Sequence, residues 1–183
     1  MPNLTSLAAV REYIGMLPVV TVDDVLLSNL IARISVMAER YCNRSFLSAA
    51  RIEVRYGSGT SAMVMLYAPI TAVASLSIAG VAIPAAPSAI TPGYRIDGNA
   101  LRLVGYKFTR DAVVEISYTA GYATVPLDVE QAVIETVMLS YRRKDHIDVT
   151  SKSLAGETIS YIISQFSASS KAALGNYRRV TPV

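Results

Sequence analysis

Hydrophobic residues recur at helical spacing near both ends of the chain and alternate with polar residues in the middle. A period of about 3.6 residues indicates a helix that buries one face, so the two end regions predict helices. We expect three main helices and a fourth, short one, over residues 4–14, 21–42, 126–143 and 169–174. Glycine or asparagine follows three of these segments and provides a helix stop, at Gly15, Asn43 and Gly175.

The second predicted helix carries two neighbouring apolar strips. One strip consists of Leu26, Leu30, Ile34, Met37 and Tyr41, and the other of Leu27, Ile31 and Ala38. A helix with two apolar strips lies in the middle of a core or shares one face with a neighbouring subunit. For the second case, the candidate residues for contact with an adjacent subunit are Leu27, Leu30, Ile31 and Ile34.

Side chains at the starts of the first two helices predict their caps. Asn3 or Thr5 is the expected cap of the first helix. Thr21 and Asp24 have the spacing of a capping box at the start of the second.

Between Phe46 and Tyr118 the period changes to two, which is typical of half-buried strands. The alternating runs are residues 51–56, 63–67, 73–78, 94–96, 101–103 and 113–118. Asp97-Gly98 separates two of these runs and predicts a β-hairpin. The connections are too short for crossover helices, so we expect an antiparallel sheet.

The chain ends in a basic segment that contains many Ser and Ala residues. From Arg142 onward there are seven basic and three acidic residues. A segment of this composition buries little surface by itself, so we expect a mobile arm that can be removed without loss of the fold. Residues 158–163 could form a strand within it.

These patterns together predict an α+β fold in three parts. Residues 1–45 and 119–149 form a bundle of three main helices, residues 46–118 an inserted antiparallel β lobe, and residues 150–183 an extended C-terminal docking arm.

Composition excludes a disordered chain and favours a protein that binds partners. Charged residues make up 17% of the chain and hydrophobic residues 52%, with a net charge of +3. This leaves ample material for a core, and an apolar excess that we expect partners to cover. The uncharged stretch between Tyr56 and Tyr94 is interrupted by proline and glycine and alternates with period two, so it predicts strands and not a membrane helix.

No motif indicates an enzyme, a cofactor site or a metal site. Cys42 is the only cysteine, which excludes an intramolecular disulfide and a cysteine-based zinc site and is consistent with a reducing cytosol. It falls on an apolar helix, where a buried, unreactive thiol is the expected state. His146 is the only histidine, and we expect it on the surface. The N-terminus lacks the pattern of a secretory signal.

The order of short motifs resembles that of the head–tail connector proteins of tailed bacteriophages, also called adaptor or head-completion proteins. The motifs are Tyr118-Thr119-Ala120-Gly121-Tyr122, Val125-Pro126, Tyr141-Arg142-Arg143 and the closing Leu174-Gly175-Asn176-Tyr177-Arg178-Arg179. The N-terminal pattern Asp23-Asp24-Val25-Leu26-Leu27 and the phrase Leu66-Tyr67-Ala68-Pro69-Ile70 are similar as well.

This resemblance implies a non-enzymatic structural virion protein at the head–tail interface, made in the cytoplasm of the bacterial host. Copies of it, usually twelve, would form a ring that docks on the portal protein, extends the DNA channel and carries the stopper or tail-completion protein. Double-stranded DNA would pass through the ring without sequence-specific binding, and no membrane or cofactor would be involved. Portal docking is expected from the arm, through Tyr161, Leu174, Tyr177, Arg178 and Arg179.

Two alternatives remain open from the sequence. One is another virion protein, such as a tail-completion or capsid-decorating β protein. The other is a small enzyme or ligand-binding α+β protein, which would need polar residues that converge on a pocket.

Overall fold

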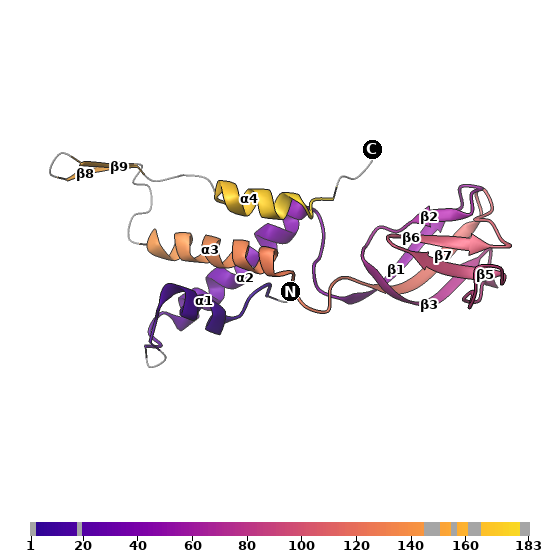
Figure 1. Cartoon of the computed structure of the whole chain (residues 1–183), viewed down its shortest axis with the longest axis horizontal. Helices are drawn as coiled ribbons and strands as arrows, with labels where there is room; N and C mark the ends of the chain where they lie inside the picture. Colours follow the sequence, from indigo (N-terminus) through magenta and orange to yellow (C-terminus); the bar gives the residue numbers. More distant parts are fainter. Residues whose placement is uncertain (1–2, 18–19, 145–150, 155–156, 161–165, 180–183) are drawn as a thin grey trace. The chain divides into compact units, whose positions relative to one another are not determined.

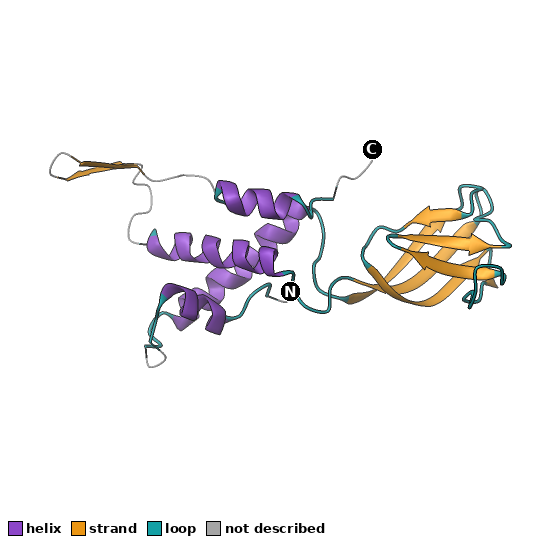
Figure 2. Cartoon of the chain, in the orientation of Figure 1, coloured by secondary structure: helices purple, strands orange, loops and turns teal. Residues whose placement is uncertain are grey.

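The computed structural model describes residues 3–17, 20–144, 151–154, 157–160 and 166–179. The chain divides into two compact units (Figure 1). The helical unit comprises Met1–Arg44 and Val125–Val183, and the β lobe comprises Ser45–Thr124. Figure 2 shows helices gathered in the first unit and a set of antiparallel strands in the second. The predicted α+β class is therefore confirmed.

The helical unit is built around its third helix. The described residues of this unit form α1 (Leu7–Ile14), α2 (Asp24–Cys42), α3 (Leu127–Arg142) and α4 (Ala168–Gly175), where the periodicity predicts them. Helix α3 packs against the other three, and α4 also contacts α2 (Figure 1). Two short strands, β8 (Ser151–Leu154) and β9 (Glu157–Ser160), pair antiparallel and come between α3 and α4 in the sequence.

The predicted cap of α1 is wrong. The Ser6 hydroxyl accepts the backbone hydrogen bond of Ala9 at 3.1 Å and is the actual N-cap. The Thr5 hydroxyl instead donates to Glu130 Oε1 on α3 at 3.0 Å. A tertiary hydrogen bond has therefore taken the side chain that local spacing assigned to the cap.

The predicted capping box of α2 does not form either. Asp23 occupies the N-cap position, and only the backbone of Thr21 is used there, as acceptor for the amide of Asp24 at 3.1 Å. The predicted stops of the first two helices are confirmed, since Gly15 and Asn43 both adopt the left-handed conformation that ends a helix.

The β lobe consists of two sheets. The strands are β1 (Ala49–Tyr56), β2 (Ala62–Val64), β3 (Ile70–Ile78), β4 (Val81–Ala82), β5 (Gly93–Asp97), β6 (Ala100–Val104) and β7 (Val113–Ala120). One sheet has the order β1-β7-β3-β4 and the other β2-β6-β5, and neighbouring strands are antiparallel in both. The predicted hairpin is β5–β6, with Gly98 in its turn.

The inner faces of the two sheets share one hydrophobic core. Met63, Leu101 and Leu103 come from the three-stranded sheet, and Val114 and Ile116 from the four-stranded sheet. The two outer faces of the sheets are therefore on opposite sides of this core.

The two ends of the β lobe lie side by side. The amide of Tyr122 donates to the carbonyl oxygen of Phe46 at 2.8 Å, and the amide of Ser48 donates to the carbonyl oxygen of Tyr122 at 2.9 Å. The chain therefore enters and leaves the lobe at one place. Gly121 is required here, because its φ is +119° and a Cβ atom would lie 2.6 Å from the carbonyl oxygen of Leu47.

Candidate assembly surfaces

Residues 166–179, the described C-terminal segment, are part of the helical unit and not a detached arm. The side chains of Phe166 and Leu174 are buried. The Cys42 thiol at the end of α2 donates to the carbonyl oxygen of Leu174 at 3.3 Å, and the Phe166 ring lies 5.7 Å from the Tyr41 ring. The expectation of a mobile, removable arm is wrong for residues 166–179, because apolar side chains among them complete the core made by α2 and α3.

The five predicted docking residues have different environments. Leu174 is buried, and the Tyr177 hydroxyl donates to Asp128 Oδ1 on α3 at 2.9 Å. Arg178 is exposed, with its guanidinium 5.6 Å from the centre of the Tyr41 ring. The backbone of Arg179 donates to the carbonyl oxygen of Cys42 at 2.8 Å. The fifth, Tyr161, lies outside the described residues.

The candidate subunit-contact residues on α2 divide in the same way. Leu27, Ile31 and Ile34 are buried inside the helical unit, so they have no surface left for a neighbouring subunit. Leu30 is half-buried, and Leu26 beside it is exposed. Of the four candidates, only Leu30 could reach an adjacent copy.

An exposed apolar loop connects α1 and α2, and the sequence analysis did not predict it. Arg11 holds the loop from inside: Nη1 contacts both carboxylate oxygens of Asp24 at 2.8 Å, and Nη2 donates to the carbonyl oxygens of Leu17 and Val20 at 2.8 and 2.7 Å. Large apolar side chains are exposed in this loop and at the helix ends beside it, and they are Tyr13, Leu17, Val20, Val22 and Val25. We call these five residues the α1–α2 apolar surface.

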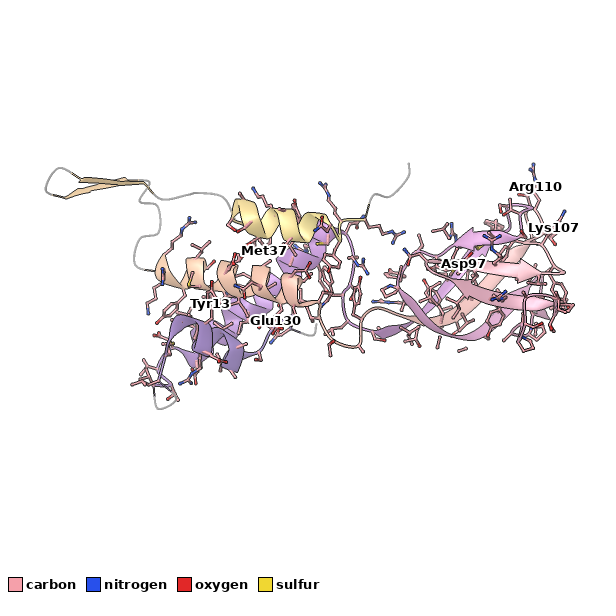
Figure 3. All side chains as sticks on the ribbon, in the orientation of Figure 1. Tyr13, Met37, Asp97, Lys107, Arg110 and Glu130 are labelled. Carbon is pink, nitrogen blue, oxygen red and sulfur yellow. The ribbon has the colours of Figure 1, made fainter. Side chains whose placement is uncertain are left out.

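A groove lies between α1 and α3, next to this surface. Its volume is about 410 Å³. Tyr13 and Leu127 supply apolar walls, and Glu12, Glu130 and Gln131 supply polar groups. Figure 3 labels Tyr13 on α1 and Glu130 on α3. An open groove of this composition suits a protein segment better than a small molecule, because it encloses too little of its contents.

Asp23 joins the start of α2 to the end of α3. Tyr141 donates to Asp23 Oδ2 at 2.6 Å, and Lys144 Nζ lies 3.3 Å from Oδ1. The hydrogen bond from Tyr141, helped by Lys144, lowers the pKa of the Asp23 carboxyl. The cluster thus stabilises the helical unit. Tyr141 and Lys144, at the two ends of the Tyr141–Lys144 segment, therefore have a structural role.

The β lobe contains a buried carboxylate. Glu53 on β1 points inward, where its Oε1 accepts a short hydrogen bond from the Tyr118 hydroxyl and a second one from the amide of Leu66 at 2.9 Å. Burial raises the pKa of Tyr118, and the hydrogen bond to Glu53 raises it further. The first tyrosine of the Tyr118–Tyr122 motif therefore ties β7 to β1.

The buried thiol of Cys42 and the carboxylates of the described residues were compared with what a nucleophile or a metal site requires. Burial raises the pKa of the Cys42 thiol to about 11, so it is not a thiolate at neutral pH. Among these residues no three His, Cys, Asp or Glu side chains gather as metal ligands would. None of the described helices is long and apolar enough to cross a membrane. His146 lies outside the described residues.

Comparisons with known proteins found similar solved structures and one family model. No curated protein matches the sequence. In solved structures, a chain in the neck of an empty gene transfer agent particle has a TM-score of 0.58 at 18% identity, with 97% of this chain and 90% of that chain covered. A chain in the neck of the native particle has a TM-score of 0.56 at 18% identity and covers 100% of this chain and 96% of that one. A chain in the native gene transfer agent virion has a TM-score of 0.58 at 18% identity, with the same coverage.

These solved structures share the fold of the whole chain, helical unit and β lobe together. A family model, described as head completion protein, matches residues 3–180. That range includes every motif on which the resemblance to head–tail connectors was based, so the resemblance is confirmed, and the chain belongs to the head completion protein family of structural virion proteins.

Proposed function

We propose that this protein is a head–tail adaptor of the virion neck. Identical copies form a ring, twelve in the virion, that docks on the portal protein, extends the DNA channel and carries the stopper or tail-completion protein. The match of the head completion family to residues 3–180 is the observation on which this rests. The protein is made in the cytoplasm of the bacterial host and ends in the virion, at the head–tail interface.

Ring formation is supported by the symmetry of similar particles and by the helical unit itself. The necks that contain chains of the same fold were computed with six-fold and twelve-fold symmetry. A cyclic ring needs two different surfaces on each subunit that fit each other. The helical unit has the α1–α2 apolar surface, exposed Leu26 and half-buried Leu30 on α2, and the groove between α1 and α3.

Two α2 substitutions separate assembly from folding. Leu30→Asp places a charge on the part of α2 that reaches the surface, so we expect a folded subunit that fails to form rings. Ile34→Asp buries an unpaired charge and should unfold the chain. Ser28→Asp, at an exposed position of the same helix, is the control and should assemble. If Leu30→Asp still formed rings of unchanged size, the proposal that α2 lies in the subunit interface would be wrong.

Portal docking is proposed for the C-terminal segment, with fewer direct contact residues than the sequence predicts. Arg178 is the predicted docking residue with an exposed side chain, and a guanidinium suits carboxylates on a partner. Tyr177 and Arg179 hold this end of the chain on α2 and α3, and Leu174 anchors it from the core. Tyr161 belongs to the same proposed docking segment.

Docking can be tested with heads that contain the portal but lack a neck. Wild-type protein should cap these heads, visible as added density at the portal vertex in electron microscopy. Arg178→Glu should keep its melting temperature but cap far fewer heads, whereas Arg33→Glu, an exposed arginine of α2, should cap normally. Normal capping by Arg178→Glu would exclude Arg178 from docking. Binding to tails instead of heads would favour the alternative of a tail-completion protein.

DNA is proposed to pass through the ring without being held. The net charge of +3 is small for a nucleic-acid binding protein, and a channel that lets DNA slide should avoid strong phosphate contacts.

A further inference from the structure

Strand β1 has the reverse of the usual polarity pattern, with apolar side chains on its outer face and charged side chains on its inner face. Its outward side chains are Ile52, Val54 and Tyr56, which are 78%, 63% and 75% exposed. Antiparallel sheets with one solvated face usually place polar residues outward and apolar residues inward. β1 is also the edge strand of its sheet, where charged residues normally protect against unwanted contacts.

The inward face of β1 shows why the strand cannot turn over. Besides the hydrogen bonds to Glu53, Arg55 Nη1 donates to the carbonyl oxygen of Val64 at 2.5 Å. The guanidinium of Arg51 lies 4.4 Å from the centre of the Tyr67 ring. A shift of one residue would turn these three side chains to the outer face and remove all their partners. The apolar stripe Ile52–Val54–Tyr56 is therefore a permanent feature of the surface.

The rest of this outer face carries an acidic group. On β7, Val113 pairs with Tyr56, Glu115 with Val54 and Ser117 with Ile52. Glu115 is exposed and forms no ion pair with any residue that the structure describes.

The opposite outer face of the lobe, on the three-stranded sheet, is apolar and basic. Val64 on β2 is exposed, and Arg102 and Arg95 stand beside each other on β6 and β5. Asp97, labelled in Figure 3, pairs with Arg102 at 3.1 Å. Arg95 is exposed and makes no ion pair within the described part of the chain.

We propose that the β lobes of adjacent copies stack face to face, with the Ile52–Val54–Tyr56 stripe and Glu115 of one copy on Val64 and Arg95 of the next. This rests on the proposed ring. Opposite faces of one lobe, complementary in charge and both apolar, are what a head-to-tail contact needs. A two-fold pairing of β1 with β1 is less favourable, since it would bring two copies of Glu115 together.

Charge reversal tests the pairing in the full chain. Glu115→Arg and Arg95→Glu should each raise the protein concentration needed for half-assembly by about tenfold, and the double variant should restore it. Both side chains are exposed, so the melting temperatures of the isolated variants should match that of the wild type. Unchanged assembly of the single variants, or no recovery in the double variant, would overturn the proposal.

The apolar stripe has a matched control. Ile52→Lys should weaken assembly, whereas Ile90→Lys should not, because Ile90 is 88% exposed but lies in the loop between β4 and β5. Equal effects of the two substitutions would contradict a role for the stripe.

A photo-crosslinker at position 54 identifies what covers the stripe. In assembled particles prepared from a mixture of heavy-isotope and ordinary subunits, we expect benzoylphenylalanine at this position to link to residues 62–64 or 100–104 of a different copy. Links to another neck protein, or between two β1 strands, would overturn lobe stacking and leave the ring intact. Absence of any ring in the particle would instead refute the proposed function.

Discussion

The backbone amide of Arg179 donates a 2.8 Å hydrogen bond to the carbonyl oxygen of Cys42, the last residue of α2. This hydrogen bond joins the C-terminal segment to the end of α2, although the two residues are far apart in the sequence. With Leu174 buried beneath, the C-terminal segment is a structural element of this unit. Exposed Arg178 is consequently held at a fixed position, which would lower the entropy cost of the proposed docking compared with a free arm.

Leu174→Ala should destabilise the helical unit by about 2–5 kcal/mol, because it leaves a cavity between α4 and α2. Urea unfolding followed by helical circular dichroism measures the loss. Lys171→Ala, at an exposed position of the same helix, is the control and should change little. Equal midpoints for the two variants would mean that α4 is not packed as described.

Tyr118→Phe should destabilise the β lobe by about 1–3 kcal/mol, because it deprives buried Glu53 of a hydrogen-bond donor. Tyr56→Phe changes an exposed tyrosine on β1 in the same way and should have almost no effect. The comparison of their urea midpoints tests whether the Tyr118–Glu53 contact holds β7 to β1.

Gly121→Ala should cost more than about 1 kcal/mol, since the new methyl group would meet the backbone of Leu47 at the base of the lobe. Gly80→Ala isolates the cost of the left-handed conformation, because Gly80 has a φ of +79° and nothing within 4 Å of its Cβ position. A larger loss at Gly121 than at Gly80 in thermal unfolding is expected. Equal losses would show that the close approach is unimportant.

Asp23→Asn should change the pH dependence of stability. The pKa of Asp23 is lowered in the folded state, so its contribution is present above the ordinary value of 3.8 and disappears as the pH falls through the lowered value. The melting temperature of the variant should therefore be below that of the wild type at pH 7, and the difference should shrink under acid conditions. Glu12→Gln, an exposed carboxylate of α1, should show no such trend.

A short Gly-Ser linker in place of residues 48–120 should leave the helical unit folded. The amide of Tyr122 and the carbonyl oxygen of Phe46 are only 2.8 Å apart, so a few residues can close the gap. Circular dichroism should show helix and a cooperative melting transition. A wholly unfolded product would mean that the lobe is needed for the core of the helical unit.

Local patterns were sufficient to predict the helices and most strands, although the short strands β4 and β8 were missed. The apolar period places α2 and α3, and Asp97-Gly98 predicts the β5–β6 hairpin, because helix period and turn preference act within a few residues. The motif around Gly121 was recognisable as well. Its physical reason, the close approach to Leu47, became visible only when two distant segments were brought together.

Tertiary packing alone decided which faces are buried. Alternation along β1 shows that its two faces differ but not which of them is buried. Glu53 faces inward because the Tyr118 hydroxyl and the amide of Leu66 donate hydrogen bonds to it there. Composition likewise suggests a free C-terminal segment, but α2 and α3 together create the site that buries Leu174. A sequence records the polarity of each side chain, whereas burial depends on the partners that the fold assembles around it.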